Sequence, residues 1–330
     1  MKRLYYIDFL KALGLAGIIV AHVQAPDWAI MVRSFDVPLM VIISSYLAAH
    51  SYDKYAGSIK ETIKYLWSRF KRLVFPTWIF LLLYFALQAI VYHGFYDAKY
   101  YAYSFALTRY GISFVWVILI YLYSALLVPV FKKIGTSKVA ILILAELYIV
   151  YELCYYHGIG VDNKIIDTTF YYIIPYGILT FLGYNFRRMS ERTKRWIIVW
   201  SGILFAVLAV YFTLINGGVF QIVQIAKYPP RIYYLSFGVF VSFLLMTVLE
   251  KRNWRLFKNK IIGFISAHSM WIYLWHILVI FVYEKLHLPE NWVLKYIVVF
   301  TGAVVVTLVV NKILDVIEKR VKLKVIKYLR

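Results

Sequence analysis

Residues 8–22 read DFLKALGLAGIIVAH, an apolar run with an acid and a base near its start and an imidazole at its end. In a continuous helix, Lys11 and His22 are about three turns apart, share a face to within roughly 20°, and are separated by about 16 Å along the axis. Asp8 lies on nearly the same face. Ionisable groups inside a membrane-spanning helix are costly and usually face a bundle interior or a watery cavity. This face is therefore a predicted functional site.

The composition is that of an integral membrane protein. Of the 330 residues, 63% are hydrophobic and only 16% are charged, which excludes an ordinary soluble domain. Apolar segments of about twenty residues, long enough to cross a bilayer, recur along the chain. The first of them is too long, and too charged at Lys11, for a removable signal peptide. No internal repeat or long linker divides the chain, so residues 1–330 are predicted to form a single domain.

The apolar segments predict an all-α, polytopic membrane protein with about ten transmembrane helices. They cover roughly residues 5–24, 35–50, 74–93, 113–131, 139–157, 169–186, 196–215, 232–249, 261–283 and 292–311. The expected location is a cell membrane that the chain crosses several times.

The connections between these segments alternate in charge, which predicts the orientation. One set, together with both termini, holds about 28 of the 37 Lys and Arg residues, and the other set holds about 8. By the positive-inside rule both termini are cytoplasmic, and His22 lies near the outer edge of the membrane. The net charge of +21 is thus assigned to membrane orientation, and no nucleic-acid partner is expected. Residues 312–330 have apolar residues at helical spacing with Lys and Arg between them. This pattern predicts an amphipathic cytoplasmic helix on the anionic inner leaflet.

A basic stretch precedes the third predicted span. Arg69 and Arg72 are spaced i, i+3, so on a helix their guanidinium groups share a face, with Lys71 beside them. Two planar guanidinium groups together suit phosphate. The alternative is a basic flank that binds anionic lipid headgroups.

The order of these features resembles the acyltransferase-3 family of integral membrane acyltransferases. The resemblance rests on four motifs: Asp8-Phe9-Leu10-Lys11 with His22; Phe35-Asp36-Val37-Pro38-Leu39 before Ser44-Ser45-Tyr46-Leu47; Arg69-Phe70-Lys71-Arg72 before Pro76; and Ser269-Met270-Trp271-Ile272-Tyr273-Leu274-Trp275-His276. The chain departs from the family at two positions. It has Lys11 where the family usually has Arg, and Ser44-Ser45 where Ser-Gly is usual.

The resemblance implies an acyl-CoA-dependent O-acyltransferase that moves an acyl group, commonly acetyl, from cytoplasmic acyl-CoA to a hydroxyl of an extracytoplasmic envelope polysaccharide or glycolipid. His22 would be the general base or would carry the acyl group itself. Its alternative is a structural histidine that caps polar groups at the outer interface. Lys11, with Asp8, would orient the site or stabilise charge developing at the thioester carbonyl. The phosphates of CoA would be held by Arg69, Lys71 and Arg72.

The same resemblance suggests further residues that position the acceptor: Arg33, Asp36, Ser44, Ser45, Tyr273 and His276. Arg33 and Asp36 have a second interpretation, in which they pair with each other. For His276 the alternative is an ordinary core histidine. The expected partners are acyl-CoA, the glycan or glycolipid acceptor and the lipid bilayer, with a second copy of the chain or other envelope-synthesis proteins as further candidates. The resemblance also implies the cytoplasmic membrane of a bacterium as the location.

The sequence lacks the motifs that are typical of metal, dinucleotide and ATP sites. No two histidines show metal-ligand spacing supported by carboxylates or thiols, so no metal site is predicted. Glycine-rich phosphate loops are absent from the sequence, which argues against a dinucleotide or ATP site. The alternative function is a non-enzymatic transporter, flippase or polymerase component for envelope glycans or lipid-linked sugars.

Overall fold

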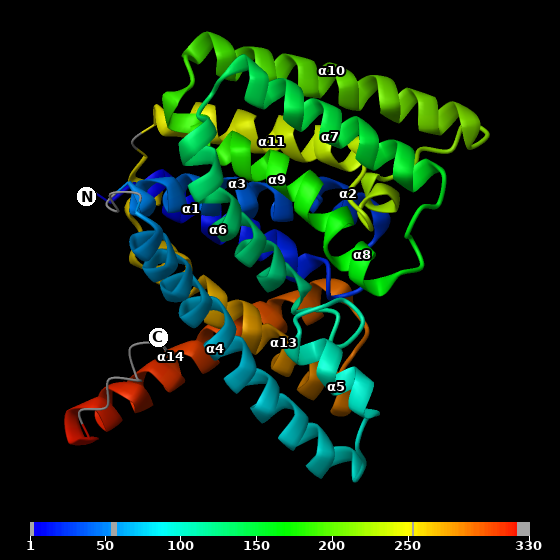
Figure 1. The fold of residues 1–330 in the computed structure, drawn as a ribbon. Coiled ribbons are helices and arrows are strands. Elements are labelled where there is room, and N and C mark those ends of the chain that lie inside the picture. The colour runs from blue at the N-terminus through cyan, green and yellow to red at the C-terminus, as the bar shows by residue number, and fades with distance from the viewer. Residues whose placement is uncertain (1–2, 54–57, 253, 322–330) are drawn as a thin grey trace. The chain divides into compact units, whose positions relative to one another are not determined.

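A computed structural model describes residues 3–53, 58–252 and 254–321 of the protein. These residues form α-helices α1 to α14 and three short 3-10 helices, η1 to η3, as Figure 1 shows. Among them there is no β-strand, only an isolated bridge between Lys227 and Pro230. The prediction of an all-α protein is confirmed.

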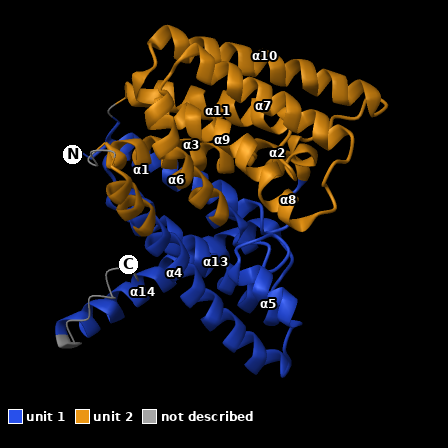
Figure 2. Ribbon diagram, viewed as in Figure 1, with its two compact units in different colours: residues 1–26, 68–118, 253–330 blue, residues 27–67, 119–252 orange. Residues whose placement is uncertain are grey.

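The helices belong to two compact units that are interleaved along the chain (Figure 2). Unit 1 consists of Met1–Pro26, Ser68–Ile118 and Asn253–Arg330, and unit 2 of Asp27–Trp67 and Leu119–Arg252. Unit 1 contains α1 (Tyr5–Val20), most of α4 (Ile59–Tyr92), α5 (Ala98–Phe105), η3 (Arg255–Lys258), α12 (Lys260–Ala267), α13 (Ser269–Lys285) and α14 (Trp292–Val321). Unit 2 contains α2 (Asp27–Arg33), α3 (Asp36–Tyr52), most of α6 (Trp116–Ile134), α7 (Lys138–Tyr156), α8 (Lys164–Thr168), α9 (Phe170–Asn185), η1 (Phe186–Arg188), α10 (Glu191–Ile215), η2 (Val223–Ala226) and α11 (Ile232–Glu250).

The described residues contain 8 helical segments long and apolar enough to cross a membrane, or 9 if α12 and α13 count as one broken span. The chain is therefore built for several membrane crossings. The predicted number of ten is not reached on these criteria, because the first predicted span, residues 5–24, has a helix of only 16 residues. At 1.5 Å per residue this helix is about 24 Å long, shorter than the hydrocarbon core.

Two predicted segments have a different form. The expected single span over residues 261–283 is broken at His268, where α12 and α13 meet at 81°. By contrast, the expected boundary between a span ending at 311 and a separate tail helix is absent, because α14 is continuous from Trp292 to Val321. No Gly or Pro lies between positions 311 and 321 to end that helix. The remainder of the predicted tail, residues 322–330, lies outside the described residues.

In unit 2, α3 packs closely against α9 and α11, as seen in Figure 1. A Cβ placed on Gly183 of α9 would lie 2.2 Å from the carbonyl oxygen of Ile42, and one on Gly238 of α11 would lie 2.4 Å from Cγ of Pro38. Small residues let helix backbones approach in this way. The glycines that permit close approach to α3 are thus on its neighbours α9 and α11.

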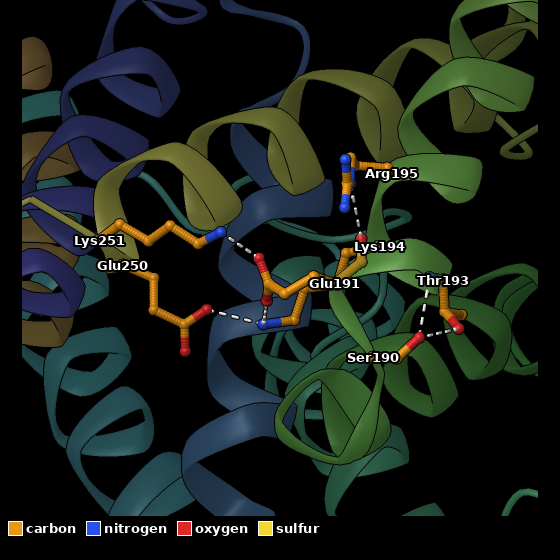
Figure 3. A network of polar contacts seen from close by, with 7 residues as sticks. All are labelled: Ser190, Glu191, Thr193, Lys194, Arg195, Glu250 and Lys251. Carbon is orange, nitrogen blue, oxygen red and sulfur yellow. Dashed lines mark hydrogen bonds and ion pairs between the residues drawn. The ribbon is translucent and has the colours of Figure 1, made fainter.

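A network of charges joins the start of α10 to the end of α11 (Figure 3). The buried ammonium of Lys194 lies 3.1 Å from Oε1 of Glu191 and 2.7 Å from Oε2 of Glu250. The other carboxylate oxygen of Glu191 contacts Lys251. Each buried charge in the network is therefore matched by an opposite charge.

Gly183→Ala should lower the free energy of unfolding by about 3 kcal/mol, because the added methyl would meet a backbone carbonyl that cannot turn away. Gly177→Ala, in the same helix, is the matched control, since its methyl would meet only a side-chain atom of Leu127, at 3.2 Å. Thermal unfolding of the detergent-purified protein measures both. Equal melting temperatures for the two variants would contradict the close packing of α3 on α9.

Candidate active site

Two rings from separate segments of unit 1 lie around His22. The helix α1 ends at Val20, so His22 lies in the turn that follows it. The continuous helix expected from Lys11 to His22 therefore ends two residues before His22. The centroid of its imidazole is 4.6 Å from that of the Phe114 ring and 5.3 Å from that of His276. Phe114 and His276 are also in contact, with centroids 6.0 Å apart. The structure therefore pairs the two predicted histidines.

His276 is fully buried in α13 and is held in one orientation. Its Nδ1 donates to the carbonyl of Tyr273, which leaves the lone pair on Nε2. Among the described residues Nε2 has no hydrogen-bond partner. The hydroxyl of Tyr273 donates to the carbonyl of Phe114, so Tyr273 holds both rings that contact His22, those of His276 and Phe114. Phe114 carried no recognisable signal in the sequence.

Asp8 and Lys11 both bind Ser266, near the end of α12. The ammonium of Lys11 donates to the Ser266 carbonyl at 2.5 Å, and the Ser266 hydroxyl donates to Oδ1 of Asp8 at 2.6 Å. Arg3 donates to the other oxygen of Asp8, also at 2.6 Å. The last carbonyls of a helix lack partners within the helix and carry partial negative charge, so a cation is stabilising there. Lys11 thus caps the broken helix.

Two arginines of α4, Arg69 and Arg72, lie in the same unit as Lys11. Arg72 is close enough to Lys11 and to Arg69 to repel both electrostatically, so three cations gather in unit 1. Lys71 is half-buried and lies about 200° round the helix from Arg69. Of the predicted phosphate-binding residues, Arg69 and Arg72 therefore group with Lys11. Lys71 lies on another face of α4.

In unit 2, Arg33 and Asp36 form a buried ion pair, 2.7 Å between Nη1 and Oδ2. The second oxygen of Asp36 accepts from the backbone N–H of Val37 at 2.6 Å, and Nη2 of Arg33 donates to Gln224 at 3.1 Å. Lys227, which sequence reasoning missed, is also buried here. Burial lowers the pKa of Lys227 to about 8, an effect that Asp36 opposes and Arg33 increases.

The serine pair of α3 has a local role in the structure. Ser45 is buried and donates to the Val41 carbonyl of its own helix at 2.8 Å, while Ser44 is half-buried.

For the described residues, no group of three His, Cys, Asp or Glu side chains is placed to hold a metal ion. Imidazole can transfer a proton, and Arg and Lys can bind anions.

Lys11→Met should destabilise the protein by about 2 kcal/mol, because it leaves the Ser266 carbonyl without its donor. Lys11→Arg keeps the charge and the donors and should retain most of the stability. Lys285→Met, at an exposed lysine of the same unit, is the control. Thermal unfolding in detergent compares the three variants. If Lys11→Met and Lys285→Met melted alike, the contact with Ser266 would not stabilise the broken helix.

Comparison with known proteins identifies the family of the chain. A family model described as an acyltransferase domain, Acyl_transf_3, matches residues 4–312. The chain is similar to proteins of Staphylococcus aureus strains MSSA476 and MW2, each named "Probable poly-beta-1,6-N-acetyl-D-glucosamine export protein", at 21% identity over 258 residues, which is 73% of this chain and 68% of theirs. No solved structure matches it. Because the family match covers nearly the whole chain, and its apolar helices suit repeated membrane crossing, the protein belongs to the acyltransferase-3 family of integral membrane acyltransferases.

Proposed function

We propose that this protein transfers a short acyl group, acetyl in the simplest case, from cytoplasmic acyl-CoA to a hydroxyl of an extracytoplasmic envelope polysaccharide or glycolipid. The observation that carries the proposal is the pairing of His22 with His276 in the same unit as the cations Lys11, Arg69 and Arg72. Membership of the family supports acyl transfer. The charge pattern of the connections supports cytoplasmic termini and a donor that enters from the cytoplasm.

His22 supplies the base. A sugar hydroxyl is a poor nucleophile until it loses its proton, and imidazole accepts a proton near neutral pH. As His22 takes that proton, the acceptor oxygen attacks the thioester carbonyl, the C–S bond breaks, and CoA leaves as a thiolate that regains a proton. In the covalent variant of this mechanism, His22 attacks the thioester first and passes the acyl group on.

His276 is proposed as a positioning residue for His22. At a centroid distance of 5.3 Å, a nitrogen of one ring can approach a nitrogen of the other. Nε2 of His276 carries its lone pair, because Nδ1 donates to Tyr273. It can therefore accept a hydrogen bond from His22 and fix which nitrogen of His22 faces the substrate.

Arg69 and Arg72, together with Lys11, are proposed to bind the phosphates of CoA. Lys11 and Arg69 each lie close enough to Arg72 for mutual repulsion, which an anionic ligand between them would relieve. From Lys11 to the end of α1 at Val20 is about 14 Å of helix, a distance that the extended pantetheine arm of CoA can bridge toward His22.

A second candidate function is export of an envelope glycan, which the names of the staphylococcal relatives favour. A transporter has no obvious chemical use for a paired histidine and a cationic site for CoA. Millimolar CoA should raise the melting temperature of the purified protein if the acyltransferase proposal holds. The absence of any shift would favour transport.

His22→Ala should reduce acyl transfer by at least about 100-fold, since the base is lost, while thermal stabilisation by CoA remains. His276→Gln should reduce turnover less and alter its pH profile, as expected for a residue that acts through His22. Transfer of radiolabelled acetyl from acetyl-CoA to envelope glycan in membrane vesicles measures both. Wild-type activity in a folded His22→Ala protein would exclude this mechanism.

Arg69→Ala and Arg72→Ala should each weaken CoA binding by about tenfold, or about 1.4 kcal/mol, through loss of a charged donor to phosphate. Lys71→Ala is the matched control, because it removes the same charge from another face of α4 and should have a smaller effect. The readout is the CoA concentration that gives half of the maximal thermal shift. Equal effects of all three substitutions would instead indicate nonspecific attraction of anions to a basic stretch.

A further inference from the structure

The helix α7 carries an acidic residue near its midpoint. Glu146 lies eight residues after Lys138, where α7 begins, and ten before Tyr156, where it ends. At 1.5 Å per residue these separations are about 12 Å and 15 Å, so a helix of this length that crosses a membrane places Glu146 near the centre of the hydrocarbon core. The side chain is exposed, and among the described residues it has no hydrogen-bond or ion-pair partner. A carboxyl group thus lies at membrane depth without a partner in its own chain.

Contact with lipid does not account for this carboxyl group. Ionisable groups within membrane segments are costly and usually face protein or a water-filled cavity. The other glutamate of the same helix, Glu152, accepts hydrogen bonds from the guanidinium of Arg231 and the backbone N–H of Ile232. The candidate span α10, of which least is buried, has no charged residue at positions 196–215. Glu146 therefore differs both from the paired glutamate of α7 and from the uncharged surface of α10.

Glu146 belongs to a row of exposed residues spaced alternately three and four positions apart. We call this row the α7 stripe, and it consists of Val139, Leu142, Glu146, Ile149, Leu153 and Tyr156. Its apolar members are between 53% and 79% exposed. These positions share one face of the helix, opposite the buried Ala140, Tyr148 and Tyr151. The spacing is that of a two-stranded coiled coil, in which one polar residue within an apolar seam fixes the register.

A second copy of the chain is complementary to the α7 stripe. Two copies in one membrane have the same orientation and depth, so a two-fold axis along the membrane normal places their Glu146 side chains opposite each other. In its protonated form a carboxyl group both donates and accepts a hydrogen bond, so two such groups can pair without any other residue. The apolar residues of the stripe would then pack against their own counterparts.

We propose that α7 is the contact between two copies of this protein, with the two Glu146 side chains hydrogen-bonded to each other at the centre of the membrane. This pairing gives the carboxyl group a partner and removes it from lipid. Hydrogen bonds between membrane helices are one of the forces that hold such helices together. The proposal concerns assembly and is independent of the proposed acyl transfer.

Counting fluorescently labelled full-length protein in lipid vesicles, at decreasing ratios of protein to lipid, measures dimerisation. The wild-type protein should form dimers, and Glu146→Leu should weaken dimerisation by about fivefold or more, because the hydrogen bonds across the contact are lost. Glu146→Gln should stay within about twofold of the wild type, since an amide also donates and accepts. Glu290→Leu makes a similar change at an exposed glutamate outside α7 and should have no effect.

Cysteine cross-linking tests the geometry of the contact. In a Cys154→Ser background, which lacks the single natural cysteine, Leu142→Cys and Ile149→Cys should each form an intermolecular disulfide on oxidation in membranes. Ile141→Cys is the matched control, because this position is 50% exposed yet lies about 100° round the helix from Leu142. It should not cross-link.

A monomeric wild-type protein in vesicles would overturn the inference, as would undiminished dimerisation of Glu146→Leu or equal cross-linking of Leu142→Cys and Ile141→Cys. If Glu146→Gln dimerised as weakly as Glu146→Leu, an ionised carboxylate would be pairing with a cation, and the proposed pairing of the two Glu146 side chains would be wrong. Thermal unfolding in detergent checks that each variant is folded. Neither measurement involves acyl transfer, so failure of the His22 mechanism would be recognised separately.

Discussion

The hydrogen bond from Lys11 to the Ser266 carbonyl resolves a difficulty that the chain creates by breaking a span. Backbone groups at membrane depth must find partners inside the protein, and the 81° bend after Ala267 leaves the last carbonyls of α12 without a continuing helix. Lys11 donates to one of them, and Asp8 holds the hydroxyl of the same serine. The break in the span is therefore a structural reason for Asp8 and Lys11 to lie in α1, in addition to their proposed part in catalysis.

This constraint also fixes His22. Asp8 and Lys11 hold the first half of α1 against α12, and the turn after Val20 then brings His22 to His276 on α13. The helix α12 therefore contacts the first half of α1, and α13 contacts the turn that follows α1. A straight span over residues 261–283 would offer neither the unpaired carbonyl for Lys11 nor this arrangement of His276.

The sequence was sufficient for the features that follow from composition and periodicity. The length and spacing of the apolar segments predict the all-α class and most of the helices. The short spacing of Arg33 and Asp36 allowed their ion pair to be predicted as one of two alternatives. The break at His268 could not, since no Pro or Gly marks it. Nor could contacts between distant positions, such as Phe114 with His22 or Ser266 with Lys11, because periodicity says nothing about which helices meet.

Compensation of charge is uneven between places in the molecule. In unit 1, Asp8 accepts from Arg3 and Ser266, while Lys11 and Arg72 lie close enough to repel each other. In unit 2, by contrast, Lys194 lies beside both Glu191 and Glu250. Placing cations together is costly in a low-dielectric environment, and ionisable groups within membrane segments usually serve a function. Under the proposed function, the phosphates of CoA would supply the negative charge that offsets Lys11, Arg69 and Arg72.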